Sequence, residues 1–301
     1  MSDRISLLLP TRGRPLLVRR LFNSILDYTA DTRSLEIVLC MDEDDTESHR
    51  LDEEKLDIVR TIGPRSTMGA YNTICLEKSS GNIIMLMNDD LTVCTPGWDE
   101  IIINFCRRFE DGIFLAYPDD MERAHLSTFP IMSRKTCEIL CRPYPEEYDD
   151  LFIDDHLFDI FIRLKHAGYN RMFYLDNVII DHRHFINGKV RPDAGYKHKN
   201  RYKDYLTFMA LRHLRQASAR RLQSAIEGAP LPDLPKGASI EIPPANLLRA
   251  LIRSFSVFML DRGLPLSRRA LWFMRFTKYY GAMKSGLGFL KRKSYKLYGS
   301  K

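Results

Sequence analysis

Apolar and polar positions along the first half of the chain form blocks that predict strands and helices in turn. Short apolar runs predict strands, and runs with an apolar residue every three or four positions predict helices. The predicted strands lie at 5–9, 35–41, 82–87, 113–117 and 127–133, and the predicted helices at 14–28, 67–78, 98–109, 134–141 and 151–167. Strands that alternate with helices are typical of an α/β fold with a mostly parallel central sheet flanked by helices.

The later part of the chain has a different pattern. Two short apolar segments at 171–174 and 177–180 predict a hairpin, and the segments after residue 200 predict helices at 203–226, 245–262 and 266–298. A Pro-rich stretch at about 228–244 has no core pattern and predicts a linker. We therefore expect one α/β domain over residues 1–200 and a helical, basic C-terminal region over residues 201–301.

Length and composition fit an ordinary globular protein. The chain has 301 residues, of which 45% are hydrophobic and 28% charged, so it can bury a large core and is not generally disordered. It shows no signal peptide, and no apolar run approaches the roughly 20 residues that span a bilayer. We expect a cytoplasmic protein whose cysteines are reduced, because no Cys-x-x-Cys pair is present.

Acidic clusters follow three of the predicted strands, at 42–45, 88–90 and 119–120. In parallel sheets the carboxyl ends of the strands form the edge that binds ligands. Two carboxylates about 4 Å apart repel by about 4 kcal/mol at an effective dielectric of 20, so a partly buried cluster needs solvent or a cation. Asp90, with Asn88 or Asp89, is therefore a candidate site for Mg²⁺ or Mn²⁺, and a solvated turn is the alternative.

Two further groups of residues have chemistry that suits such a site. His182 and His184 are two positions apart in "DHRH", so either could supply another metal ligand, although a structural histidine pair is the alternative. Thr11, Arg12 and Arg14 follow a strand and precede a helix, where cations and free N–H groups favour a phosphate or a nucleotide.

Taken in order, these motifs resemble a GT-A fold glycosyltransferase of the family-2-like type. The matching segments are "LPTRGRP", "MGAYN", the acidic motif followed by "TPGWDE", "DDHLFDIFIRLKHAGY" and "DHRHFINGKVRPDAGY". The resemblance covers roughly residues 4 to 200. It implies a GT-A type nucleotide-diphospho-sugar transferase fold with an α-helical C-terminal extension, a nucleotide-sugar donor and a divalent metal, Mn²⁺ or Mg²⁺.

The resemblance also implies roles for individual residues. The residues expected to bind the nucleotide or the donor are Thr11, Arg12, Arg14, Asp42 (at the base), Gly69, Asn72, Asn88 and Asp89. Asn88 and Asp90 occupy the outer positions of the DxD motif, and His184, or otherwise His182, would complete the metal site. Because the amide oxygen of Asn88 binds a cation more weakly than a carboxylate, metal affinity would rest on Asp90, with Asp89 as the alternative.

Asp154 and Asp155 resemble the acidic pair that supplies the catalytic base in inverting members of the family. An acceptor hydroxyl is a poor nucleophile, so it needs a carboxylate within hydrogen-bonding reach. Which of the two acts as base stays open at this point. The alternative is a charge pair that stabilises the start of a helix through the helix dipole.

The C-terminal segment from Leu264 to Lys301 contains many Lys and Arg residues and no Asp or Glu. Its cations alternate with aromatic residues, of which Trp272, Phe273, Phe276, Tyr279 and Tyr280 are examples. This pattern predicts a peripheral contact with an anionic membrane. The alternatives are packing on the catalytic domain, a homo-oligomer contact and, least favoured, nucleic acid.

These observations together predict a metal-dependent glycosyltransferase of bacterial surface polysaccharide assembly, with inversion preferred. A UDP-sugar is the favoured donor, and the acceptor is a glycan or a lipid-linked glycan. Within enzymes, the alternative is a sugar-phosphate nucleotidyltransferase, although "LPTRGRP" lacks a clear Gly-rich phosphate loop with a catalytic lysine. Asn88 motivates a second alternative, a catalytically silent scaffold that keeps the fold.

Overall fold

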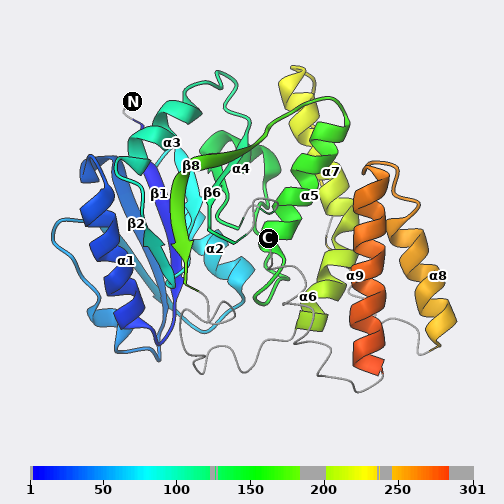
Figure 1. Cartoon of the computed structure of the whole chain (residues 1–301), viewed down its shortest axis with the longest axis horizontal. Helices are drawn as coiled ribbons and strands as arrows, with labels where there is room; N and C mark the ends of the chain where they lie inside the picture. Colours follow the sequence, from blue (N-terminus) through cyan, green and yellow to red (C-terminus); the bar gives the residue numbers. More distant parts are fainter. Residues whose placement is uncertain are drawn as a thin grey trace.

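Strands and helices alternate in the first half of the structure, and only helices follow in the later part (Figure 1). The computed structural model describes residues 3–122, 126, 128–183, 201–235, 237 and 246–284. The strands are β1 (Ile5–Thr11), β2 (Leu35–Asp42), β3 (Ile58–Gly63), β4 (Ile83–Leu86), β5 (Leu91–Val93), β6 (Leu115–Asp119), β7 (Ile131–Ser133) and β8 (Met172–His182). The α-helices are α1 (Pro15–Tyr28), α2 (Met68–Lys78), α3 (Trp98–Cys106), α4 (Arg134–Leu140), α5 (Ile153–His166), α6 (Arg201–Ala210), α7 (Arg212–Ile226), α8 (Leu247–Phe258) and α9 (Leu266–Lys284).

The described strands form one mostly parallel sheet in the order β3-β2-β1-β4-β7-β6-β8-β5. β7 runs antiparallel to both of its neighbours, and β5 is antiparallel to β8. The sequence pattern missed β3, an edge strand with mixed polarity, and β5, which has only three residues. The predicted hairpin over 171–180 is wrong, because β8 is a single strand in which Asp176 and Asn177 lie outside the ladder at a register shift. The predicted helix over 203–226 is two helices, α6 and α7, separated at Leu211.

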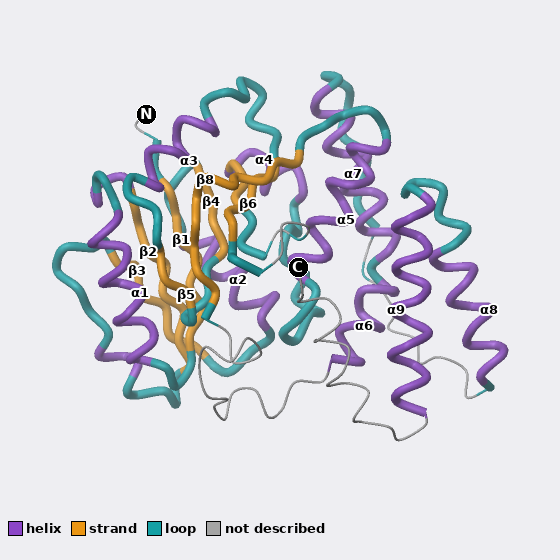
Figure 2. The backbone as a smooth tube through the Cα atoms, viewed as in Figure 1, coloured by secondary structure: helices purple, strands orange, loops and turns teal. Residues whose placement is uncertain are grey.

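The sheet carries one hydrophobic core on each face, because side chains alternate along its strands. Leu7 and Ile37 pack with α1 and α3, whereas Leu8 and Val38 pack with α2, α4 and α5. Helices α6 to α9 add their side chains to the second core, and they lie beyond α5 on that side (Figure 2). The C-terminal helices are thus continuous with the core under the sheet. The predicted boundary near residue 200 and part of the predicted linker lie outside the described residues.

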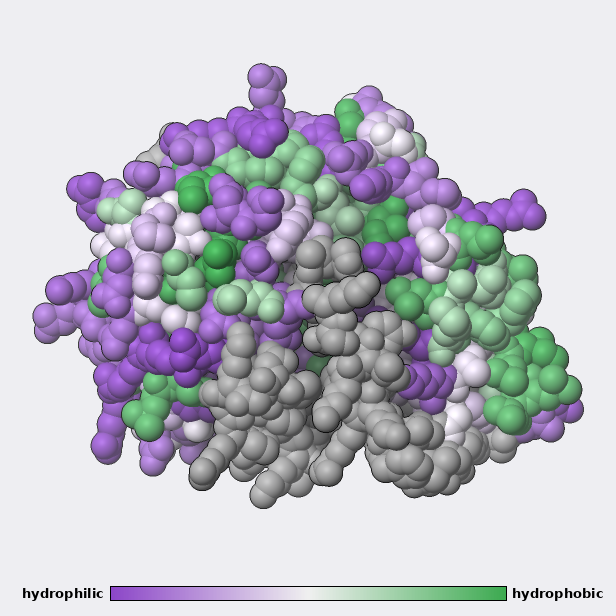
Figure 3. Space-filling model, in the orientation of Figure 1, coloured by the Kyte–Doolittle hydropathy of each residue, from purple (hydrophilic) through white to green (hydrophobic). Residues whose placement is uncertain are grey.

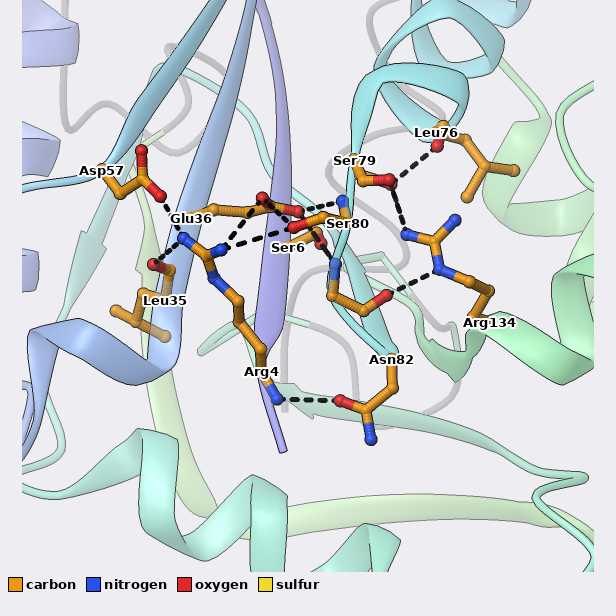
Figure 4. Close-up of polar contacts among 11 residues, drawn as sticks. Arg4, Ser6, Leu35, Glu36, Asp57, Leu76, Ser79, Ser80, Asn82 and Arg134 are labelled. Atoms are coloured by element: carbon orange, nitrogen blue, oxygen red, sulfur yellow. Dashed lines mark hydrogen bonds and ion pairs between the residues drawn. The ribbon is translucent and has the colours of Figure 1, made fainter. Parts of the chain in front are cut away.

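A buried carboxylate connects the amino ends of β1, β2 and β4 (Figure 4). Glu36 of β2 is 2% exposed and accepts hydrogen bonds from Ser6 of β1 and from the N–H groups of Ser80 and Gly81, just before β4. Burial acts to raise the pKa of Glu36, but these hydrogen bonds outweigh it and hold the pKa below its usual value. A Cβ on Gly81 would lie 2.5 Å from the Ser6 hydroxyl, so a larger residue does not fit. The network fixes three strands whose opposite ends form the candidate site.

A second buried network joins α5 to the C-terminal helices. Arg163 of α5 pairs with Asp159 at 2.7 Å and makes two hydrogen bonds, of 3.0 and 2.8 Å, to Asp261 between α8 and α9. Arg215 of α7 contacts the same Asp159 oxygen at 2.9 Å and lies 3.6 Å from the ring centroid of Phe208. The four charged side chains are at most 5% exposed, so each depends on its partners for the solvation lost on burial.

Arg163→Met should therefore lower the free energy of unfolding by about 3–5 kcal/mol, because it leaves a buried carboxylate without its partner. Urea unfolding measures this loss. Arg33→Met is the matched control and should have a much smaller effect, because the Arg33 side chain of the Arg33–Asp31 pair is 89% exposed and exposed ion pairs contribute little to stability. Equal effects of the two substitutions would contradict the structural role of the buried network.

Candidate active site

The carboxyl ends of β1 and β2 bring together residues expected at a nucleotide pocket. Arg12, just after β1, forms ion pairs with Asp44 and with Asp42, the last residue of β2, and both pairs hold the pKa of Arg12 above its usual value. Tyr71 of α2 donates a hydrogen bond to Asp42. Burial and this hydrogen bond raise the pKa of Tyr71 to about 12. Asp42 is 1% exposed and rigidly held. Sequence reasoning did not select Tyr71, although it lies within "MGAYN".

Asp89 orients two side chains at the end of β1. Its Oδ2 accepts a hydrogen bond from the Thr11 hydroxyl at 2.9 Å, and its Oδ1 pairs with Nη1 of Arg14 at 2.9 Å. Burial raises the pKa of Asp89 against the opposing effect of Arg14, and the neighbouring Asp90 raises it further. Both Asp89 oxygens are therefore engaged in holding the Thr11 and Arg14 side chains at this edge of the sheet.

Asp90 lies next to His182 because β5 pairs with β8. Leu91 of β5 is opposite His182, and the N–H of Arg183 donates to the carbonyl of Asp90 at 2.9 Å. Oδ1 of Asp90 and Nε2 of His182 are 3.4 Å apart, with side chains 5% and 12% exposed. Burial acts to lower the pKa of His182, but its contact with the Asp90 carboxylate outweighs this effect and raises the pKa. The structure thus brings together two predicted metal ligands that are distant in sequence.

The geometry of this pair fits a divalent cation. Two ligands at right angles on an ion with bonds of about 2.1 Å lie about 3 Å apart, close to the 3.4 Å between Asp90 and His182. A carboxylate oxygen with oxygen ligands from water or phosphate suits Mn²⁺ or Mg²⁺, and the imidazole nitrogen favours Mn²⁺ of the two because Mg²⁺ prefers oxygen ligands. Asn88 is exposed two residues earlier, and His184 lies outside the described residues. In the described part of the chain no group of three His, Cys, Asp or Glu side chains forms a metal site.

The first turn of α2 contains Gly69, and close packing explains why this position is a glycine. A Cβ at Gly69 would lie 2.0 Å from the carbonyl oxygen of Pro145, and the N–H of Gly69 donates to the carbonyl of Tyr148 at 3.1 Å. Asn72 is 4% exposed one turn further along α2. α2 therefore links Asp42, through Tyr71, to the segment that precedes α5. Contact of Gly69 and Asn72 with a donor stays a prediction.

Asp154 and Asp155 lie in the first turn of α5 and have different surroundings. Asp154 is half-buried, and its Oδ1 accepts a hydrogen bond from the N–H of Asp155 at 2.9 Å. Asp155 is 9% exposed, and its Oδ1 is 3.2 Å from Nη1 of Arg275, which comes from α9. The side chain of Arg268, also in α9, stacks on Phe158 at 4.9 Å. Sequence reasoning missed both arginines because they follow Asp155 by more than a hundred residues.

Asp204 of α6 supports the segment that leads into α5. Its carboxylate accepts hydrogen bonds from the N–H groups of Asp149, Asp150 and Leu151 at 2.8, 3.1 and 2.8 Å. Burial raises the pKa of Asp204 to about 6, although the three N–H donors act in the opposite direction. The C-terminal helices thus contact both Asp155 and the loop before it.

The aromatic residues of the basic segment are largely in the core, not at the surface. Trp272, Phe276 and Tyr280 are 4%, 1% and 1% exposed, and Phe273 and Tyr279 are half-buried. The described part of this segment therefore packs on the rest of the protein, which was one of the alternatives to a membrane contact. These three side chains are not available to a membrane. Searched over its described residues, the structure contains no helix that is long and apolar enough to span a bilayer.

Solved structures share this architecture. S. aureus TarS 1–349 in complex with UDP-GlcNAc matches with a TM-score of 0.55 at 12% identity, over 94% of this chain and 92% of that chain. The mannosyltransferase PcManGT from Pyrobaculum calidifontis, in complex with GDP-Man and Mn²⁺, matches with a TM-score of 0.51 at 13% identity, over 99% and 86%. No protein-family model and no curated protein sequence matches the chain. The chain has a GT-A-like glycosyltransferase fold, which confirms the fold expected from the sequence.

The raised pKa of Asp204 predicts that the free energy of unfolding depends on pH. Between about pH 4 and pH 6 the folded protein keeps the Asp204 proton, whereas an unfolded Asp, with a pKa of about 3.9, has lost it. Stability from this group should therefore fall as the pH rises through that window, by on the order of 2 kcal/mol after allowance for solvent screening. Urea unfolding of wild type and Asp204→Asn at several pH values measures the difference, and parallel curves would contradict the assignment.

Proposed function

We propose that this protein is a glycosyltransferase that moves a sugar from a nucleotide-sugar donor to an acceptor hydroxyl with inversion. The observation that carries the proposal is that Arg14, Asp89, Asp90 and His182 meet beside the carboxyl ends of β1 and β4 in a GT-A-like sheet. Ligands of α/β sheets bind at such ends. TarS and PcManGT are solved with UDP-GlcNAc and GDP-Man, which supports a nucleotide-sugar donor here.

The donor nucleotide would lie along the ends of β1 and β2. Asp42, held by Arg12 and Tyr71, is in a position to accept a hydrogen bond from an N–H group of a base, and uracil is the preferred base. Arg14, held by Asp89, would contact the diphosphate together with the Thr11 hydroxyl. Gly69, Asn72 and Asn88 complete the proposed donor contacts.

Asp90 and His182 would hold a divalent cation, Mn²⁺ or Mg²⁺, with Asn88 as a weaker oxygen ligand and His184 as an alternative nitrogen ligand. The complex of PcManGT with Mn²⁺ supports a metal in this fold. When bound, the ion neutralises charge on the departing nucleoside diphosphate. Asp90 and His182 contribute by fixing one oxygen and one nitrogen at a distance that suits a single ion.

Asp155 is the proposed base for the acceptor hydroxyl, and Asp154 stabilises the start of α5. Deprotonation of the hydroxyl requires a carboxylate within hydrogen-bonding reach, and the contact with the Arg275 guanidinium at 3.2 Å orients the Asp155 carboxylate. Arg275 is a positioning residue in this scheme. The acceptor we favour is a glycan or a lipid-linked glycan of bacterial surface polysaccharide assembly, at the inner face of the plasma membrane.

The alternatives are a sugar-phosphate nucleotidyltransferase and a catalytically silent scaffold, the latter motivated by Asn88. A panel of nucleotide sugars and of nucleoside triphosphates with sugar phosphates, assayed with Mn²⁺, distinguishes them. Release of nucleoside diphosphate from a nucleotide sugar supports the transferase, and release of pyrophosphate supports the nucleotidyltransferase. Absence of both turnover and donor binding supports the scaffold.

Asp90→Ala should reduce Mn²⁺-dependent release of nucleoside diphosphate at least hundredfold, because it removes the carboxylate ligand of the proposed cation. The matched control is Glu43→Ala, which removes an exposed carboxylate from the same edge of the sheet and should leave turnover unchanged. Turnover of a UDP-sugar panel measures both variants. Retention of metal-dependent turnover by Asp90→Ala would remove this residue from the metal site.

Asp155→Asn should reduce sugar transfer by about 10²–10⁴-fold, because an amide does not accept the acceptor proton. Asp154→Asn should reduce it less than Asp155→Asn does. Donor binding, followed by a thermal shift with UDP and Mn²⁺, should be retained by both variants. A larger loss in Asp154→Asn would transfer the role of base to Asp154.

A further inference from the structure

Helix α8 exposes a stripe of large apolar side chains. Leu248, Ile252 and Phe255 are four and three positions apart, which places them on one side of the helix, and they are 65%, 57% and 47% exposed. The buried side of the helix consists of Ala250, Ser254 and Phe258, and the Phe255 ring also contacts Phe273 of α9, with ring centroids 5.8 Å apart. We call Leu248, Ile252 and Phe255 the α8 stripe. Leu247, at the start of α8, and Leu260, just after its end, are also exposed, at 55% and 64%.

The surroundings of the α8 stripe are cationic. Arg249 and Arg253 lie on the neighbouring side of the helix, and Arg262 is exposed just beyond its end. The only acidic residue between Asn246 and Lys284 is Asp261, which is buried and paired with Arg163. Figure 3 shows the apolar surface over α8 at the right of the molecule, on the far side of α5 and α7 from the sheet.

We propose that the α8 stripe docks on an anionic lipid surface, with Leu248, Ile252 and Phe255 in the acyl boundary and the flanking arginines at the head groups. An apolar stripe with arginines on the neighbouring side of the helix is the pattern of an interfacial helix, and each cation near an anionic leaflet strengthens binding about fivefold. A second copy of the chain fits less well, because two such cationic surfaces repel each other. This contact differs from the one the sequence predicted, since Trp272, Phe276 and Tyr280 are buried.

Co-sedimentation of the full-length protein with vesicles tests the proposal. Wild type should bind vesicles of phosphatidylglycerol and phosphatidylcholine, and binding should weaken as salt is raised and on pure phosphatidylcholine. The triple variant Leu248→Ser, Ile252→Ser, Phe255→Ser should bind at least tenfold more weakly. Leu16→Ser is the matched control, because Leu16 is an apolar residue of α1 that is 79% exposed, and it should bind as wild type does.

A second variant keeps the proposal testable if the triple variant does not fold. Arg249→Gln with Arg262→Gln keeps the α8 stripe and should weaken vesicle binding about 25-fold, since two exposed cations are lost. Wild-type protein that does not bind anionic vesicles, or binding equal in wild type and both variants, would overturn the proposal. So would a wild-type dimer by light scattering that the triple variant converts to monomer without vesicle binding. Donor hydrolysis with Mn²⁺ is measured in parallel and tests the proposed function separately, because α8 lies on the other side of the molecule from β5, the strand that follows Asp90 (Figure 2).

Discussion

The candidate site depends on the antiparallel pairing of β5 with β8. Leu91, Thr92 and Val93 lie opposite His182, Asp181 and Ile180, and this short ladder places Asp90 beside an imidazole from a distant part of the chain. The pairing also explains why a buried strand can lead directly into two carboxylates. Asp89 is compensated by Arg14 and Thr11, and Asp90 by the groups at the end of β8. The repulsion between the two carboxylates is therefore offset by groups from two places, the segment that follows β1 and the end of β8.

Two buried polar networks keep this arrangement in place. The Glu36 network fixes the amino ends of β1, β2 and β4, so their carboxyl ends present Thr11, Asp42 and the acidic motif at defined positions. The network of Arg163, Asp159, Arg215 and Asp261 fixes α5 against the C-terminal helices. Because α9 also supplies Arg275 to Asp155, the C-terminal helices belong to the environment of the proposed base and are not an independent appendage.

The sequence predicted the elements with strong periodicity and the residue types at the strand ends. β1, β2 and β4 and helices α1, α2 and α5 lie close to where the pattern placed them, since their apolar positions are regular. The pattern failed where tertiary contacts decide the structure. Asp176 and Asn177 resemble a turn but are accommodated at a register shift within β8, and Trp272 and Phe276 resemble a membrane-facing helix but fill the core beside α6. The sequence around Arg275 does not indicate its role, because that role comes from the contact with Asp155, which is distant in sequence.

Pulsed electron paramagnetic resonance of the full-length protein with Mn²⁺ and UDP tests most directly whether Asp90 and His182 bind one cation. An imidazole nitrogen bound to Mn²⁺ modulates the electron spin echo. We predict this nitrogen modulation in wild type and in His184→Gln, and its loss in His182→Gln and in Asp90→Ala. Absence of the modulation in wild type, or its loss in His184→Gln alone, would contradict a cation site built on Asp90 and His182.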